Sequence, residues 1–530
     1  MTGDAAADEA AGGAAGGVAA TGQRGGRLRA PLLIALFALL MALPAIVNGK
    51  PFIFYDTVQY YEIGEQILSR IAPAPEGEAQ AAAPPEALIP DDPGAGAVEA
   101  EIGGGYSTIG AGRSPVYALF LYCLTQLASL WAVVAMQALI VAALVYRLLQ
   151  VLAPKASLGG QIALVGALAL LTPLGFHVGF LMPDIFGGVF LLAALILLFD
   201  RAPGWPLILV LTGLMAFSAT MHATNMALGL ILLAVILAGR FLPGLRHAAS
   251  LNAAGAAAAA VIASLAFGEL YRIGVERFTG SELRNAPYLA GRVIADGPGE
   301  RFLAERCEGS ELAICRFSGV DYVDHNDFLW GGAGNLQNWV ASPIEVRNAV
   351  QAEERDFVIA AVAAYPGMQL AASLQNTMMQ LWFFGIRETS NGAEMVVQTP
   401  NFAETSLMQK VPGLDGCAEG VRCEPFHPVR EGWGVTVHTA TLIVLTGWLV
   451  LLALYLRPAL LQPAAMEPRL RDCLLAGGLV ILVLLANAAL CGALSGPHDR
   501  YQARLAWVPA LLAGLGLLHV MSRRADETPA

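Results

Sequence analysis

The chain has 530 residues, of which 56% are hydrophobic and only 14% are charged, and its mean hydropathy is +0.58. Because soluble globular proteins carry roughly 25% charged residues, this composition excludes a cytosolic enzyme or a disordered regulator as an interpretation of the whole chain. Lys and Arg total 31 against 42 Asp and Glu, which gives a net charge of −11 and no basic footprint for a nucleic-acid partner. The composition indicates a polytopic membrane protein with water-facing loops.

The N-terminal region lacks an apolar run, and the first such run begins only after it. Residues 1–29 are rich in Ala and Gly, so we expect them to form a disordered cytoplasmic tail. The rest of the chain contains ten apolar runs whose lengths approach the roughly 20 residues that cross a bilayer. These runs are residues 30–48, 131–152, 159–175, 184–199, 205–221, 225–241, 249–270, 433–456, 473–494 and 505–521.

Basic residues in the short loops orient these runs. With the arginines before the first run placed inside, alternating crossings return every short basic loop to the cytoplasmic side. The loops carry Arg147 and Lys155, Arg201, Arg240 and Arg246, Arg457, Arg469 and Arg471, and finally Arg523 and Arg524. The sequence therefore predicts an all-α transmembrane helical bundle of about ten spans, with both termini cytoplasmic. We expect a bacterial inner-membrane protein with large periplasmic loops.

This topology divides the chain into modules. They are an N-terminal transmembrane module at 30–270 with a first outer loop at 49–130, a mixed but mostly helical periplasmic domain at 271–432, C-terminal transmembrane helices at 433–521 and a cytoplasmic tail at 522–530. Two further apolar stretches, 116–129 and 358–386, are candidates for crossings. We expect both to lie on or beside the membrane, since counting the second would place Arg457 outside.

Four of the seven cysteines lie in the predicted periplasmic domain, as the close couples Cys307/Cys315 and Cys417/Cys423. An even number of cysteines in an oxidising compartment favours disulfide bonds. Four cysteines allow three pairings, and we expect each couple to pair locally. Free thiols are the alternative.

Two acidic residues are predicted at the same depth on the outer face. Asp56 follows the first run at the start of a helix-like stretch that ends at Ile71, and Asp184 follows Pro183 before the fourth run. Ionisable groups near the apolar phase are typical of functional sites. The structural alternative for each is an N-terminal helix cap, a position that Asp fills well.

Three polar clusters share that face. They comprise Arg113 to Tyr117 with the sequence Arg-Ser-Pro-Val-Tyr, Thr220 to Asn225 around His222, and Gly496 to Arg504, which includes His498, Arg500 and Tyr501. Arg500 and Arg504 are one helical turn apart and can share a helix face. Guanidinium groups bind phosphate oxygens well, which favours a phosphate site. Alternatively, Arg500 pairs with Asp499 or Asp56 and only holds helices together.

The order and placement of these motifs resemble the GT-C glycosyltransferases, polytopic membrane enzymes that use polyprenyl-phosphate-linked sugars. The matching elements are Asp56 followed by Tyr60 and Tyr61, the Arg113–Tyr117 element, Pro183-Asp184, and Arg500-Tyr501 before the last apolar run. The resemblance covers roughly residues 30–245 and the final outer turn. It implies a GT-C-like fold and inverting transfer of a sugar from a polyprenyl-phosphate donor to a glycan or lipid acceptor in the periplasm or cell envelope.

The resemblance also implies roles for individual residues. Asp56 would act as general base, and Asp184 would orient the acceptor or share a divalent metal ion with Asp56; the metal requirement stays open. Donor phosphate would meet Arg500, Arg504 and Arg113, and substrate would contact Tyr60, His222, His498 and Tyr501. The main alternative is a transporter or flippase of lipid-linked sugars, which typically has polar groups at mid-membrane depth. The ten runs contain few acids or bases and no clear repeat, so the sequence favours the enzyme over the transporter. A degenerate, non-catalytic scaffold is a third possibility, which mutation can separate from the enzyme.

Overall fold

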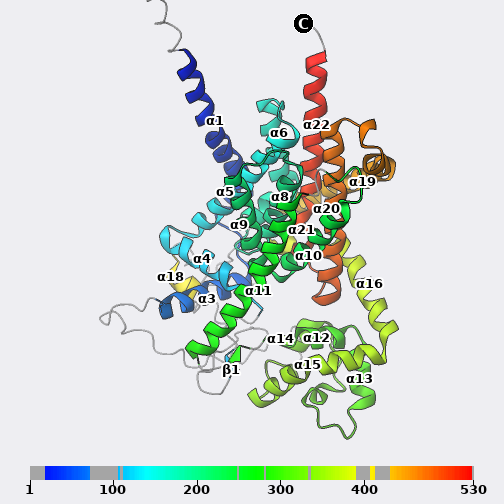
Figure 1. Cartoon of the computed structure of the whole chain (residues 1–530). Coiled ribbons are helices and arrows are strands. Elements are labelled where there is room, and N and C mark those ends of the chain that lie inside the picture. The colour runs from blue at the N-terminus through cyan, green and yellow to red at the C-terminus, as the bar shows by residue number, and fades with distance from the viewer. Residues whose placement is uncertain are drawn as a thin grey trace, which may run out of the picture.

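The computed structural model describes residues 18–71, 106–107, 112–246, 250–279, 282–283, 285–331, 336–389, 406–411 and 430–527. This part of the chain is almost entirely helical, as the sequence predicted. Its strands are the two-residue β1 (Tyr106–Ser107) and β2 (Glu282–Leu283), which pair in parallel. A long helical bundle carries a smaller helical domain at one end (Figure 1).

Each of the ten predicted apolar runs falls mainly on helix. The helices are α1 (Val18–Met41), α2 (Leu43–Asn48), α5 (Leu130–Leu152), α6 (Leu158–Leu171), α7 (Leu174–Val178), α8 (Ile185–Phe199), α9 (Trp205–Met221), α10 (Ala223–Gly239), α11 (Leu251–Thr279), α19 (Arg430–Leu461), α20 (Pro468–Leu494), α21 (Asp499–Ala506) and α22 (Val508–Glu527). Every residue of α8 is buried, so this helix forms the centre of the bundle.

Five helical segments of the described chain are long and apolar enough to cross a membrane. They are Leu130–Leu152, Leu251–Phe278, Gly432–Leu461, Pro468–Leu494 and Asp499–Ala525. Helices α6, α8, α9 and α10 are apolar but shorter. The lengths and composition of these helices support a membrane protein with several transmembrane helices.

The two ends of the bundle gather different loops. The start of α1 and the end of α22 lie at the same end, opposite the smaller domain (Figure 1). At the end shared by the termini, Arg201 after α8 pairs with Asp472 near the start of α20 at 3.1 Å, and His519 of α22 pairs with Glu467 at 3.1 Å. Loops that the sequence assigned to one side of the membrane therefore meet in space.

The smaller domain has a core of its own. Its elements are α12 (Tyr288–Ala295), α13 (Pro298–Arg306), the 3-10 helix η1 (Ala313–Phe317), α14 (His325–Trp330) and α15 (Ile344–Ala364). Their core is built around Phe317, Phe328 and Trp339. A disulfide joins Cys307 to Cys315, the local pairing predicted for that couple. The second couple, Cys417 and Cys423, lies outside the described residues.

The helices on either side of this domain's core, α11 and α16 (Pro366–Trp382), pack against helices of the bundle. Helix α11 runs on to Thr279, past the predicted boundary at residue 270, and the domain core spans residues 286–361. Helix α15 is followed by α16 after a bend of 101°, where Pro366 cannot continue the first helix. Counted as one broken span, this pair would be a sixth candidate crossing. Helix α16 packs against α20, and Phe384 and Ile386 join the bundle cores.

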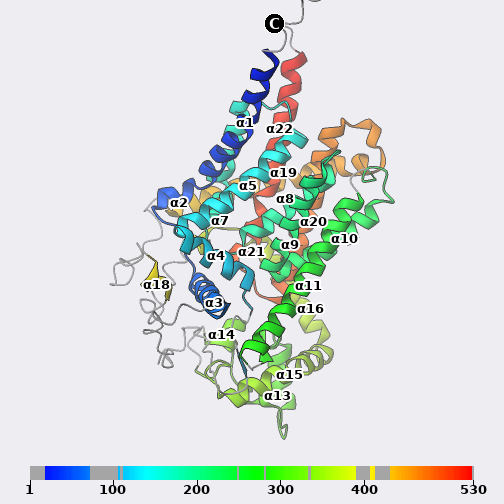
Figure 2. The same ribbon diagram turned by 60° about the vertical axis from the view of Figure 1, so that its left-hand side comes forward.

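The segment predicted as the first outer loop packs against the end of the bundle that faces the smaller domain. Its helices are α3 (Tyr55–Ile71) and α4 (Pro115–Leu127), which lie at that end of the bundle (Figure 2). They pack so closely that a Cβ at Gly64 would lie 2.5 Å from the Ala118 carbonyl oxygen. Ser114 caps α4 by accepting a bond from the Tyr117 backbone N–H at 3.2 Å, and Pro115 fits the first turn.

Candidate functional site

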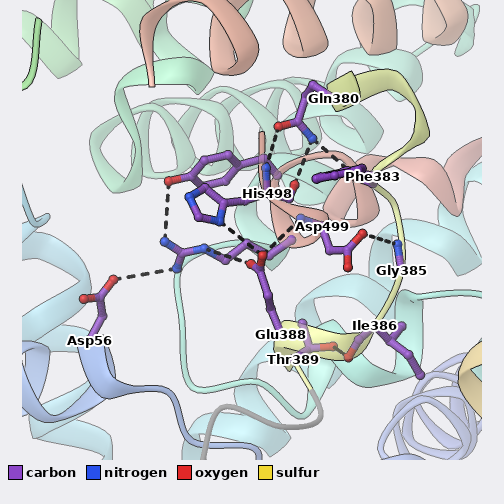
Figure 3. A network of polar contacts seen from close by, with 11 residues as sticks. Asp56, Gln380, Phe383, Gly385, Ile386, Glu388, Thr389, His498 and Asp499 are labelled. Atoms are coloured by element: carbon purple, nitrogen blue, oxygen red, sulfur yellow. Dashed lines mark hydrogen bonds and ion pairs between the residues drawn. The ribbon is translucent and has the colours of Figure 1, made fainter. Parts of the chain in front are cut away.

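The end of the bundle that faces the smaller domain brings together charged side chains from segments far apart in the sequence. Asp56 comes from α3, Arg113 precedes α4, Glu388 follows α16, and His498 and Arg500 lie at the start of α21. Figure 3 shows the part of this network around Glu388 and His498. Ser114 also donates to the Thr220 carbonyl oxygen at 2.9 Å, which ties the first outer loop to the turn between α9 and α10.

Asp56 forms ion pairs with two arginines. Its Oδ1 accepts a bond from Arg113 Nη2 at 2.6 Å, and its Oδ2 lies 3.7 Å from Arg500 Nη1. The helix-capping role is taken by Thr57, whose Oγ1 accepts from the Phe54 backbone N–H at 2.9 Å and donates to the Leu181 carbonyl oxygen at 3.1 Å. The carboxylate of Asp56 is thereby directed at the arginines.

Arg113 and Arg500 keep the Asp56 carboxyl ionised. Burial raises the pKa of this carboxyl, but the charges of Arg113 and Arg500 and the hydrogen bond from Arg113 outweigh it. The pKa therefore lies below its ordinary value of 3.8, and Asp56 is ionised at neutral pH. The neighbouring Tyr60 is buried, and burial together with the Asp56 charge raises its pKa. Tyr60 thus stays a neutral phenol.

Arg500 lies between two aromatic rings and two carboxylates. Its guanidinium carbon is 4.7 Å from the Phe54 ring centre and 5.0 Å from that of Tyr501. Its Nε lies 3.7 Å from Glu388 Oε2, the same distance that separates Nη1 from Asp56. Asp499, a partner suggested by the sequence, instead accepts a bond from the Gly385 backbone N–H at 3.0 Å.

Glu388 is the functional candidate that the sequence did not reveal. Its Oε1 accepts from His498 Nδ1 at 3.1 Å and from the Asp499 backbone N–H at 3.2 Å. Burial raises its pKa, but the bond from His498 and the Arg500 charge hold that pKa below its ordinary value of 4.5. Glu388 is therefore a second ionised carboxylate beside Arg500.

Arg504 lies deeper, inside the bundle, and its side chain is fully buried. Its Nη2 donates to Asn487 Oδ1 at 2.8 Å and approaches Cys491 Sγ at 3.7 Å. Within the described part of the chain, its Nε and Nη1 have no hydrogen-bond partner. Buried cations require a compensating anion or acceptor, so Arg504 is equipped to bind an anion.

Asp184 is buried as well and does not cap its helix. It occupies the N-cap position of α8, but its side chain makes no capping bond, and only 2% of the residue is exposed. Its Oδ1 has no hydrogen-bond partner among the residues that the structure describes. The pKa of Tyr60 is raised by burial, by the Asp56 charge and, to a smaller extent, by the Asp184 charge.

The remaining predicted substrate-binding residues surround the Tyr501 ring. His222 begins α10, accepts from the Thr224 backbone N–H at 3.2 Å, and lies 6.1 Å from Tyr501 between ring centres. His498 lies 5.2 Å from the same ring. Arg504 approaches it too, with its guanidinium carbon 5.7 Å from the ring centre. The nine predicted catalytic, phosphate-binding and substrate-binding residues therefore gather at one end of the bundle.

The described residues contain no group of three or more His, Cys, Asp or Glu side chains arranged to hold a metal ion. The two predicted acids therefore have no third ligand of these types beside them in that part of the chain. The site is instead dominated by arginine. Its chemistry suits the binding of an anionic group next to an ionised carboxylate.

No protein-family model, curated protein or solved structure matches this chain. The functional interpretation therefore depends on the geometry and charges of the site.

Proposed function

We propose that this protein is an integral membrane glycosyltransferase of the GT-C type. It transfers a sugar, with inversion, from a polyprenyl-phosphate donor to a glycan or lipid acceptor in the periplasm or cell envelope of a bacterium. The observation that carries the proposal is the meeting of Asp56, Arg113 and Arg500, contributed by three distant segments, above the buried and incompletely bonded Arg504. An ionised carboxylate beside several guanidinium groups suits phosphate departure coupled to proton abstraction.

The proposed topology has ten crossings of the inner membrane with both termini cytoplasmic. It is supported by the loops at the two ends of the bundle. Arg201 and Asp472 meet at the end where the termini lie, whereas Trp433 Nε1 donates to the Leu170 carbonyl oxygen at 2.6 Å toward the other end. In this arrangement the site faces the periplasm, and the short helix α8 crosses inside the bundle, where every one of its residues is buried.

In the proposed reaction the donor phosphate binds Arg504 and Arg500. The lipid tail lies between the helices, where its apolar surface stays out of contact with water. As the bond between the sugar and the phosphate breaks, negative charge accumulates on the departing polyprenyl phosphate. Fixed guanidinium groups stabilise that charge without reorganising solvent. Arg504 is the stronger candidate for close contact because two of its nitrogen atoms, Nε and Nη1, have no hydrogen-bond partner in the described structure.

Asp56 is the proposed general base. Its low pKa keeps it ionised, but the two arginines also reduce its basicity while no substrate is bound. A phosphate that engages Arg500 withdraws part of that positive charge and makes Asp56 a stronger base when donor is present. The acceptor hydroxyl then gives its proton to Asp56 as its oxygen attacks the anomeric carbon. One in-line displacement inverts the configuration.

Asp184 and Tyr60 are proposed to orient the acceptor. The free Oδ1 of Asp184 is a buried acceptor for a sugar hydroxyl, and the neutral phenol of Tyr60 can donate or accept. Bonds of this kind discriminate strongly between hydroxylated ligands, since an unfilled buried acceptor is costly.

The test is the variant Asp56→Asn in a strain that lacks the chromosomal gene. Mass spectrometry of envelope glycans and glycolipids identifies the product that disappears on deletion. We expect wild-type protein to restore it and Asp56→Asn to fail while being produced and folded normally. Full restoration by Asp56→Asn would refute the catalytic role. Flux of lipid-linked sugar across proteoliposomes without product formation would instead establish the transporter.

A further inference from the structure

The segment that follows α16 is fastened to the turn that carries His498. The Gln380 side chain is fully buried and makes two reciprocal bonds to the His498 backbone: Nε2 donates to the carbonyl oxygen at 2.8 Å, and Oε1 accepts from the N–H at 2.9 Å. The Asp499 side chain accepts a hydrogen bond from the Gly385 backbone N–H. These contacts dock the segment against the turn (Figure 3).

Glu388 adds a carboxylate to the contacts made by Gln380 and Asp499. It is mostly buried, with 22% of its side chain exposed, and its two oxygens face different partners. Oε1 receives His498 Nδ1 and the Asp499 N–H, while Oε2 faces Arg500 Nε. Taking an ionised carboxylate out of water is costly unless its partners compensate. The position of this charge beside Arg500 points to a task in the site.

Arg500 is shared by two carboxylates on different edges of its guanidinium. Asp56 lies 3.7 Å from Nη1 and Glu388 lies 3.7 Å from Nε, while Phe54 and Tyr501 cover its faces. A phosphate that binds Arg500 must compete with both carboxylates. The competition lowers the affinity for the anion, but it also fixes the guanidinium in one orientation before the anion arrives.

We propose that Glu388 is a positioning residue for the transfer reaction, holding Arg500 and His498 in line with Asp56 and yielding Arg500 to the donor phosphate. This inference rests on the proposed function. It assigns a share in the site to the segment after α16, which Gln380 and Asp499 dock beside His498. Positioning at the expense of affinity gives an unusual signature: loss of the carboxylate charge tightens phosphate binding and impairs turnover.

The experiment measures binding of polyprenyl monophosphate, with polyprenol as the uncharged control, to the purified full-length protein in detergent. The variant is Glu388→Gln, which keeps an oxygen for the Asp499 N–H and removes the charge. Removal of a unit negative charge this close to Arg500 should tighten polyprenyl monophosphate binding about five-fold or more. Polyprenol binding should not change, and the deletion strain complemented with this variant should lose its envelope product.

The matched control is Glu65→Gln. Glu65 pairs with Lys410 at 2.6 Å on the same outer face and lies in α3, as Asp56 does. Neutralising it removes the same charge from that face, so it should leave both binding and product formation at wild-type levels. If Glu388→Gln does not fold, Glu388→Asp carries the test. It keeps the charge but withdraws the carboxylate, so we expect near-wild-type phosphate affinity with reduced product.

The outcomes separate this inference from the proposed function. Wild-type protein that binds polyprenyl monophosphate no better than polyprenol would overturn the proposed function itself. Wild-type protein that prefers the phosphate, with a Glu388→Gln variant that binds it equally or more weakly, would overturn only the role of Glu388. Unimpaired product from Glu388→Asp would do the same. A purely structural role predicts weaker binding in every variant, never tighter binding.

Discussion

The substitution Asp56→Asn separates the structural contribution of the outer charge network from its proposed chemistry. Removing one partner of a buried ion pair costs about 3–5 kcal/mol. Here the side chains of Arg113 and Asp56 are 17% and 12% exposed, so solvent screens part of that energy. Asn also keeps an oxygen that can accept the bond from Arg113. We therefore expect a loss of about 1–2 kcal/mol in the free energy of unfolding.

Loss of a general base typically lowers the rate about 10²- to 10⁴-fold. Such a fall far exceeds what the modest destabilisation can cause. The assay combines denaturation of the purified variant in detergent with the amount of envelope product in the complemented strain. Glu65→Gln, which breaks an exposed ion pair, should cost less than about 1 kcal/mol and keep the product. The reasoning is refuted if Asp56→Asn keeps wild-type product, or if product falls only in proportion to folded protein.

Three further predictions concern charge, anion binding and the disulfide. The folded-state pKa of Asp56 lies below 3.8. The ionised carboxylate therefore contributes its full stabilisation above about pH 4, and this stabilisation is lost as the pH falls through the lower folded-state pKa. In thermal unfolding, acidification from about pH 5 to pH 3 should destabilise the wild-type protein more than Asp56→Asn. Arg504→Gln should weaken the binding of polyprenyl monophosphate, measured by direct titration, about ten-fold or more. The control Arg246→Gln changes a short loop that the sequence assigns to the opposite face, and it should leave this binding unchanged. Equal losses of affinity in the two variants would show a non-specific charge effect. The bond between Cys307 and Cys315 closes a short loop with a sequence separation of 8, so reduction should destabilise the smaller domain by about 2–3 kcal/mol; unchanged melting under reductant would contradict this.

The helices of the bundle were predictable because apolar runs report burial in protein or lipid directly. Run boundaries and observed helices agree within a few residues for α5, from residue 131 to 152, and for α9. The break after Ala364 was not predicted, because residues 358–386 read as one apolar stretch. Pro366 was the available signal, since a proline inside an apolar stretch commonly ends a helix.

Residues of the site were predictable only where a charged side chain lies in a turn flanked by apolar runs. Asp56, Arg113 and Arg500 were visible for that reason. Glu388 was not, since it lies 110 residues from His498 and no local pattern links them. Asn487 was overlooked within an apolar run, although a buried amide there needs partners. It bonds to Gln502, the Tyr501 carbonyl oxygen and Arg504, and so holds the start of α21.

The turn after α2 and the turn before α8 are joined through their main chains. The Phe52 N–H donates to the Gly179 carbonyl oxygen at 2.9 Å, and the Leu181 N–H donates to the Phe52 carbonyl oxygen at 2.9 Å, which forms an isolated parallel bridge between Phe52 and Phe180. Bonds of this type do not depend on side-chain identity. The separation between the turns that carry Asp56 and Asp184 can therefore survive amino-acid replacement at the bridge itself. A replacement at Phe52 or Phe180 must still fill the buried space of these rings, but the backbone bridge itself continues to set the spacing of the two carboxylates.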